Sequence, residues 1–301
     1  MKTRETRSAA LKITAAPHVW SAESTTRIMW SVVLSLMPVV VASIWLFGPS
    51  ALLVILAAVA GCLLTERLFG TAKNSLADGS AMITGLLLGL CLPAGFPLWM
   101  AFLGGVFGIG FGKIIFGGLG QNVFNPALLG RAFLQAAFPV AITTWPARTA
   151  DWWALRGDNF AIPFMSPSST DAVTGATPLG ELKFGDDPVV TPLLDLFVGS
   201  TGGSLGETSA VLILLGGIYL AVRGHLNWHI SVSILLSVFV FSGIFYQFDL
   251  SPFTPVFMLF SGGLMLGAWY MATDMVTSPV TNKGCWLFGV GIGLLVVIIR
   301  I

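Results

Sequence analysis

Long apolar segments alternate with short polar ones along most of the chain. A helix that crosses a bilayer needs about 20 apolar residues, and nine segments approach or reach that length. The nine predicted helices are 28–47, 51–68, 81–92, 98–116, 127–140, 209–222, 230–245, 253–271 and 285–301. A weaker segment at 189–198 carries Asp195 and is interrupted by Pro192, so we expect it to be re-entrant or at the surface. Because the short alternating strands of a membrane barrel are absent from this pattern, it predicts an all-α polytopic membrane protein.

The composition agrees with this pattern and excludes several classes of protein. Apolar residues make up 55% of the 301 residues, charged residues only 10%, and the mean hydropathy is +0.87. Since a soluble domain carries about 25% charged residues, a soluble enzyme, a nucleic-acid-binding protein and a disordered chain are excluded. The three cysteines have no CxxC spacing and indicate neither a zinc site nor a disulfide framework. His225 and His229 are four residues apart, which fits an interfacial pair on one helix face better than a metal site.

The distribution of basic residues predicts the orientation in the membrane. The N-terminal segment 1–27 is polar and basic, and the positive-inside rule places it in the cytoplasm. The longest polar stretch, 143–187, then lies outside, and its acidic residues outnumber its basic ones, in agreement with the rule. Lys113 lies at a predicted helix end, from which we expect its long side chain to extend to the cytoplasmic interface.

Two glycine patterns recur in the same order in the two halves of the chain. Gly85-Leu-Leu-Leu-Gly89 matches Gly263-Leu-Met-Leu-Gly267, and Phe107-Gly-Ile-Gly-Phe-Gly112 matches Phe288-Gly-Val-Gly-Ile-Gly293. The offsets are similar, 178 residues (263 − 85) and 181 residues (288 − 107). Glycines in membrane helices allow backbones to approach closely. Two matches at nearly one offset indicate an internal repeat.

The repeat predicts a transporter-like architecture. The third and eighth predicted helices cross in opposite directions, so the halves are inverted repeats of five helices each, about ten in all. The first repeat is 28–142, the external loop is 143–187, and the second repeat is 188–301. Since the second repeat has four predicted helices, we expect the partner of the fifth helix to begin after Ile301 and the chain to lack its last helix.

Charged residues within the apolar segments are few, and such residues often mark function. Arg131 lies one turn into the fifth helix, where it either holds a carboxylate or an anionic ligand, or forms a structural ion pair. Glu66 ends the second helix and Asp274 ends the eighth. Both carboxylates are candidates for an ion pathway, and both fit interfacial charges equally well.

A glycine turn at 117–120 leads into two amide side chains, Asn122 and Asn125. Asn125 precedes Pro126, which is typical of an N-cap followed by proline at the first helical position. Both amides offer hydrogen-bond donors and acceptors that suit a flat heterocycle. The alternative is that they only cap the helix.

The external loop contains a polar turn, Asp171-Ala-Val-Thr-Gly-Ala-Thr177-Pro178. Gly175 permits an unusual backbone conformation, and Pro178 restricts Thr177 to an extended one. This presents the Thr177 hydroxyl for modification. The residues alone leave the modifying group open.

Three motifs resemble one family of redox-driven ion pumps. The first is the flavinylation motif Asp-x-x-Ser/Thr-Gly-Ala-Thr, matched here by Asp171, Thr174, Gly175, Ala176 and Thr177. The segments 112–133 and 272–279 also look like that family. It comprises RnfD, from the Rnf complex, and NqrB, from the sodium-pumping NADH–quinone reductase. The Gly-Leu-Gly-Gln-Asn run at 118–122 and the modest length favour the Rnf branch, and the resemblance covers nearly the whole chain.

The resemblance implies two flavin cofactors. FMN would be esterified through its phosphate to Thr177 by a flavin transferase on the outer side. Riboflavin would bind non-covalently among the membrane helices, toward the cytoplasm. Asn122 and Asn125 are candidates for binding its ring, and Arg131 is a further cofactor-binding candidate.

The resemblance also implies partners and a location. The chain would carry electrons to and from the other subunits, of the A, B, C, E and G types, of an ion-translocating ferredoxin–NAD⁺ oxidoreductase. That complex couples electron transfer to Na⁺ or H⁺ movement across a bacterial or archaeal cytoplasmic membrane. The alternatives are an NqrB-type protein and a passive inverted-repeat channel or transporter, since architecture does not fix function. A passive channel has no reason to carry the motif that ends at Thr177.

Overall fold

The computed structural model describes residues 23–70, 75–146, 152–163, 177–184, 192–199, 201–207 and 209–301, and its regular elements are helices. The α-helices are α1 (Thr25–Phe47), α2 (Pro49–Phe69), α3 (Ser80–Leu90), α4 (Leu98–Ile109), α5 (Pro126–Ala137), α6 (Pro139–Thr143), α7 (Pro178–Phe184), α8 (Leu193–Val198), α9 (Ala210–Val222), α10 (Trp228–Gln247), α11 (Pro255–Phe260), α12 (Leu264–Leu266) and α13 (Asn282–Arg300). The π-helices η2 (Gly110–Ile114) and η4 (Gly267–Met271) continue α4 and α12. The short 3₁₀ turns are η1 (Ser75–Asp78) and η3 (Leu205–Glu207).

Every apolar segment that the sequence predicts as a membrane helix is helical, which confirms the all-α prediction. Two of the nine are interrupted: the fifth at Phe138, before α6, and the eighth at 261–263, between α11 and α12. In the weak segment at 189–198, the described residues 192–198 contain the six-residue helix α8.

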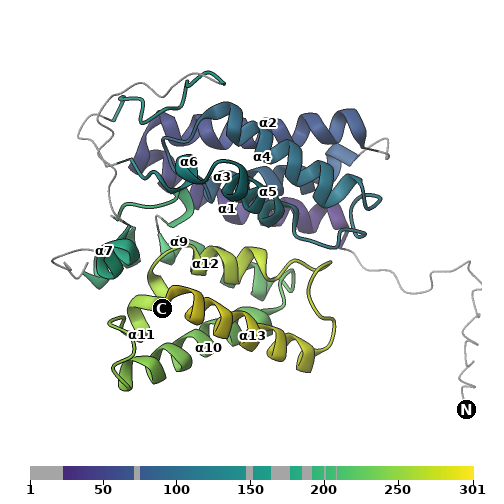
Figure 1. The fold of residues 1–301 in the computed structure, drawn as a ribbon. Coiled ribbons are helices and arrows are strands. Elements are labelled where there is room, and N and C mark those ends of the chain that lie inside the picture. The colour runs from purple at the N-terminus through teal and green to yellow at the C-terminus, as the bar shows by residue number, and fades with distance from the viewer. Residues whose placement is uncertain are drawn as a thin grey trace, which may run out of the picture.

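The helices form two layers (Figure 1). Helices α1–α6 make one layer and α10–α13 the other, while α9 packs against α1 at the junction. The main buried core joins the layers, because it takes apolar side chains from the first five helices and also from α9, α12 and η4. A second core lies within α10, α11 and α13.

The two ends of the bundle are distinguished by the loops that cover them. We call the end where α1 begins the N-terminal end, and the end where α1 finishes the loop end. At the loop end, Trp152 Nε1 donates to the Trp45 carbonyl at 3.1 Å, and the Leu98 amide donates to the Asn159 carbonyl at 3.0 Å. Corresponding helices of the two halves, such as α4 and α13, run in opposite directions (Figure 1), as an inverted repeat requires.

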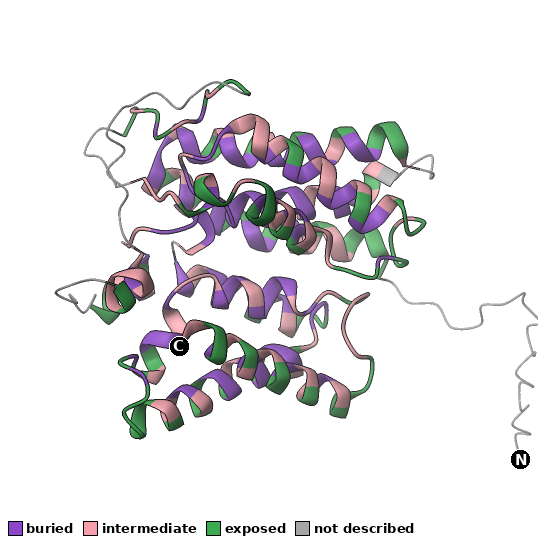
Figure 2. Ribbon diagram, viewed as in Figure 1, coloured by how far each residue is buried: buried purple, intermediate pink, exposed green. Residues whose placement is uncertain are grey.

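The outer faces of the helices carry many exposed residues (Figure 2), and many of these are large and apolar, which suits a lipid environment. Large side chains such as Trp45, Val222 and Leu287 are more than three-quarters exposed. Patches of this extent are unusual on a soluble monomer but match lipid tails. Among the described helices, α1, α2, α10 and α13 are long and apolar enough to cross a membrane, and α3, α9 and the run Leu98–Ile114 are shorter and apolar. The chain is therefore a multi-pass membrane protein.

The break between α11 and α12 is satisfied by a charged side chain. Gly262 takes the left-handed φ of 66° that ends α11. Arg300, at the end of α13, donates to the carbonyls of Met258 at 2.5 Å and Ser261 at 2.9 Å. Carbonyls freed within a membrane need partners from the protein itself. A guanidinium also stabilises the negative end of a helix dipole.

Lys113 is buried, so the expectation that it extends to the interface is wrong. Its Nζ donates to Glu66 Oε1 and to Ser80 Oγ, both at 2.5 Å, and lies 3.8 Å from Asp78 Oδ2. Glu66 is itself only 2% exposed. The lysine stays buried because α2, η1 and α3 bring carboxylates and a hydroxyl within reach of its ammonium group. The result is a buried charge cluster at the N-terminal end, in which Glu66 is a partner of Lys113 and not an interfacial charge.

Glycines allow the closest helix pairs to form. The largest helix–helix interfaces join α2 to α4 and α10 to α13. A Cβ at Gly105 would lie 2.5 Å from the Ala58 carbonyl oxygen, and one at Gly289 would lie 2.6 Å from Ser233 Cβ. Both distances are shorter than any real contact, so only glycine fits. Gly291, on the exposed face of α13, has open space instead.

Gly289→Ala should destabilise the protein, because the added methyl group forces α10 and α13 apart. We expect a loss of about 1–3 kcal/mol, measured as a lower thermal unfolding midpoint of the detergent-solubilised chain. Gly291→Ala is the matched control, since it adds the same methyl group to the same helix in open space. Equal midpoints for the two variants would show that this interface does not need glycine.

Lys113→Met should cost about 3–5 kcal/mol, because it leaves buried carboxylates without their cation. The double variant Glu66→Gln/Lys113→Met should recover part of that loss. Lys283→Met, at an exposed lysine, is the control. The measurement is again the thermal midpoint in detergent, and a Lys113→Met midpoint equal to that of the control would contradict the charge cluster.

Candidate functional site

A cavity lies between the two layers at the N-terminal end. Its walls come from α1, α3, the turn before α5, the end of α9, and η4 with the loop that follows it. The space open to the centre of a water-sized sphere is about 130 Å³. One buried water needs only about 10–15 Å³ on that measure, so the cavity has room for a ligand. The apolar part of its wall includes Val32, Ile83, Leu87, Leu119, Leu220 and Leu226.

Both predicted amides line this cavity, but they differ in how fully their side-chain atoms are hydrogen-bonded. Asn125 Oδ1 accepts from the amides of Ala127 and Leu128 at 3.0 and 3.3 Å, and its Nδ2 donates to the Met271 carbonyl at 3.2 Å. It therefore caps α5 and ties this helix to η4. Asn122 donates to the Phe124 carbonyl at 3.2 Å, while its buried Oδ1 has no partner among the described residues.

Asp274 faces the same cavity from the loop after η4. Its carboxylate accepts from the Val276 amide and the Thr277 hydroxyl, both at 3.3 Å. Burial raises the pKa of the Asp274 carboxyl, and these hydrogen bonds oppose that effect. Asp274 and Asn122 thus share the wall of the cavity, and Asn122 Oδ1 is left as an acceptor among the described residues.

Both π-helical segments contribute to the cavity wall. Lys113 comes from η2, and Trp269 and Tyr270 come from η4. Such segments are frequent at functional sites, because the extra residue redirects side chains. The Tyr270 hydroxyl donates to the Ser35 carbonyl at 3.3 Å, whereas Trp269 Nε1 is buried without a partner in the described part of the chain.

The expectation that His225 and His229 share a helix face is wrong. His225 lies in the turn before α10 and is buried against the cavity, because that turn folds inward after α9. His229, on α10, stacks on Trp228 with ring centroids 4.0 Å apart. Sequence reasoning missed Trp269 and His225 as cavity residues. The available signal was the position of each at the end of an apolar segment.

Thr177 begins α7. Its Oγ1 accepts from the Gly180 amide at 3.2 Å, and the residue is half-buried. Lys183 Nζ, at the other end of α7, donates to the Arg300 carbonyl at 3.2 Å, so α7 lies beside the end of α13. The other motif residues, Asp171, Thr174, Gly175 and Ala176, lie outside the described residues.

Arg131 lies apart from the cavity, beside the break between α11 and α12. A Cβ at Gly263 would be 3.9 Å from Arg131 Nη1 and 3.8 Å from Glu207 Oε1. Of the two alternatives for Arg131, this position favours the structural one. Sequence reasoning missed Glu207, because it lies in a glycine-rich polar turn and not in an apolar segment.

The arrangement suits binding of a planar, polar ring. The walls of the cavity are largely apolar. Three polar groups face it without hydrogen-bond partners in the described structure: Asn122 Oδ1, Trp269 Nε1 and the His225 imidazole. Buried polar groups are normally hydrogen-bonded, so three unpartnered groups around one cavity indicate a ligand with both donors and acceptors. Glu66 does not line the cavity, although its partner Lys113 does.

Comparison with known proteins places the chain in a family. A model of the NQR2, RnfD, RnfE family matches residues 12–301. The chain is 40% identical to the D subunit of the proton-translocating ferredoxin:NAD(+) oxidoreductase complex of Clostridium ljungdahlii, with 96% of this chain and 86% of the relative covered. It is 38% identical to the D subunit of the Na(+)-translocating ferredoxin:NAD(+) oxidoreductase complex of Acetobacterium woodii, with 97% and 85% covered. These matches agree with the resemblance seen in the motifs: the chain belongs to the NQR2/RnfD/RnfE family.

Proposed function

We propose that this chain is the electron-carrying membrane component of an ion-translocating ferredoxin–NAD⁺ oxidoreductase. It carries FMN covalently on Thr177 and a second, non-covalent flavin in the cavity. It works with subunits of the A, B, C, E and G types in a bacterial or archaeal cytoplasmic membrane, with the flavin loop outside. Two relatives named for H⁺ and Na⁺ translocation, similar over nearly all of the chain, support this reading.

The observation that carries the proposal is the flavinylation motif ending at Thr177. The described end of the motif fits the role. Thr177 is half-buried, and its Oγ1 accepts a hydrogen bond from the Gly180 amide, which leaves the hydroxyl proton free to be replaced by a phosphoester. The flavin transferase would use this hydroxyl as the acceptor.

The lining of the cavity supports riboflavin as its ligand. The uracil-like edge of that ring has an N–H donor flanked by carbonyl acceptors. Asn122 Oδ1 would accept from the donor, and Trp269 Nε1 would donate to a carbonyl. The apolar walls would cover the faces of the ring. When bound, the flavin supplies the redox chemistry, and the chain's own residues bind it, orient it and exclude water.

The two proposed flavin positions lie at opposite ends of one membrane helix. Asn227 Nδ2 donates to Cys285 Sγ at 3.1 Å, which places the start of α13 beside the turn that carries His225. Lys183 places α7 and Thr177 at the other end of α13. A helix of 19 residues is about 28 Å long, close to the thickness of a bilayer core. This geometry supports one flavin on each side of the membrane.

Thr177→Ala should abolish covalent flavin, because the esterified oxygen is removed. The measurement is in-gel flavin fluorescence of the denatured chain, coexpressed with its flavin transferase. Thr281→Ala is the matched control, since Thr281 Oγ1 also accepts from a glycine amide three residues on, at 3.2 Å, but outside the motif. Persistent fluorescence in Thr177→Ala, or none in the unaltered chain, would contradict the covalent assignment.

Asn122→Ala should weaken riboflavin binding about tenfold, the effect of one lost hydrogen bond in a buried site. Asn125→Ala should also cost about 1 kcal/mol of stability, because this residue caps α5. The measurements are the riboflavin Kd by fluorescence quenching and the thermal midpoint. Asn227→Ala removes a comparable cap outside the cavity and serves as control. An unchanged Kd in Asn122→Ala would mean that this amide does not contact the ring.

A further inference from the structure

His225 is a cavity group that binding alone does not explain. It is 6% exposed, and neither of its ring nitrogens has a hydrogen-bond partner among the described residues. Burying an imidazole without a partner is unfavourable. An unpartnered imidazole facing a cavity is therefore suited to act on what the cavity holds.

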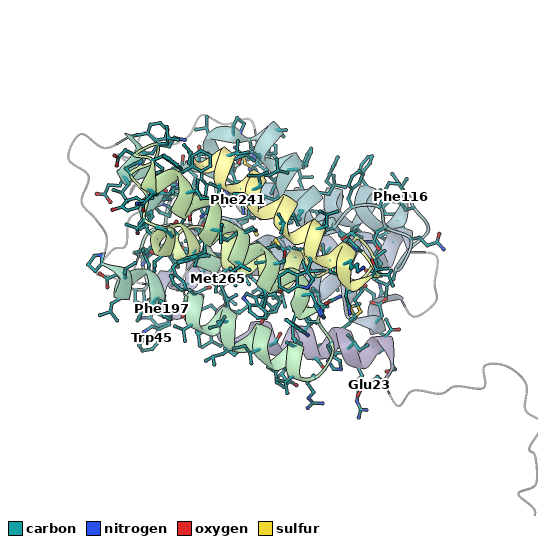
Figure 3. The ribbon with its side chains drawn as sticks, turned by 90° about the horizontal axis from the view of Figure 1, so that it is seen from below. Glu23, Trp45, Phe116, Phe197, Phe241 and Met265 are labelled. Atoms are coloured by element: carbon teal, nitrogen blue, oxygen red, sulfur yellow. The ribbon has the colours of Figure 1, made fainter. Side chains whose placement is uncertain are left out.

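Glu23 connects this imidazole to the surface. Its Oε2 lies 3.6 Å from His225 Nε2, and its side chain is 40% exposed. Arg27, one turn along α1, lies 3.9 Å from Oε1 and helps to fix the carboxylate. Glu23 is at the N-terminal end of the molecule, opposite Trp45 at the loop end (Figure 3). The pair thus runs from the buried cavity to the aqueous side of that end.

The other titratable groups of the cavity wall are engaged within the protein. Lys113 is held by Glu66, Ser80 and Asp78. The Asp274 carboxylate accepts two hydrogen bonds, and the Tyr270 hydroxyl donates to a backbone carbonyl. Among the described residues that line the cavity, His225 alone combines free ring nitrogens with a carboxylate that reaches water.

We propose that His225, backed by Glu23, is the proton donor and acceptor for the flavin in this cavity, an inference that rests on the proposed function. Two-electron reduction of the ring adds two electrons from a partner protein of the complex and at least one proton at a ring nitrogen. The imidazolium of His225 gives that proton and becomes neutral. It regains a proton from water through the Glu23 carboxyl, and reoxidation reverses both transfers. The structure thus assigns a proton path to the N-terminal end.

The test uses the full chain in detergent, with Thr177→Ala so that riboflavin in the cavity is the flavin observed. Dithionite reduces it in a stopped-flow experiment, and the loss of flavin absorbance gives the rate. His225→Gln keeps the size and hydrogen bonding of the side chain but does not carry a proton. We expect normal riboflavin content and reduction slowed about 100-fold, as for loss of a general acid. In His225→Ala, which leaves room for a free imidazole, adding imidazole should restore the rate. Glu23→Gln should slow reduction less, and His229→Gln, outside the cavity, should not slow it.

Each outcome supports or overturns the proposal. Normal flavin content with an unchanged rate in His225→Gln, or slow reduction in His225→Ala that imidazole does not restore, overturns the proton role and leaves the flavin site standing. If His225→Gln loses its flavin, Glu23→Gln decides, because this exposed residue does not line the cavity: an unchanged rate there also overturns the role. Absence of riboflavin from the unaltered cavity contradicts the proposed function itself, and the proton role with it.

Discussion

Inside a bilayer there is no water to satisfy backbone carbonyls and amides, and this constraint shapes the centre of the molecule. The eighth apolar segment can break between α11 and α12 only because Arg300 donates to the carbonyls of Met258 and Ser261. Past the break, α12 and η4 turn Trp269 and Tyr270 toward the gap between the layers. The Asn125 amide, bonded to the Met271 carbonyl, then closes the cavity from the other side.

Buried charged side chains also find their partners within the protein. Lys113, Glu66, Ser80 and Asp78 form one compact cluster, so that no member is buried without an opposite charge or a hydroxyl beside it. Arg131 and Glu207 face each other across the gap left by Gly263. Among the described residues, Asn122, Trp269 and His225 have buried polar atoms at the cavity without a hydrogen bond. At these positions a bound ligand would supply the missing hydrogen bonds.

The sequence predicted the parts of this structure that depend on local pattern. Apolar length located α1 to α5 and α9 to α13 but not α7, which lies in the predicted polar loop, and the Asn125-Pro126 pair located the start of α5. Pairings between distant segments were not predictable, because hydropathy does not record which charges meet. Lys113 therefore looked interfacial although it pairs with Glu66, 47 positions away. Likewise Asn122 and Asp274 were chosen separately, and only the fold shows that they share a cavity with His225.

The function proposed for this chain requires two flavins of different attachment at opposite ends of the membrane. The flavin content of the unaltered, purified chain after acid precipitation tests this requirement directly. We expect one FMN retained in the protein pellet, on the peptide that contains Thr177, and one riboflavin released into the supernatant per chain. A pellet without flavin, or a supernatant without riboflavin, would contradict the two-flavin arrangement.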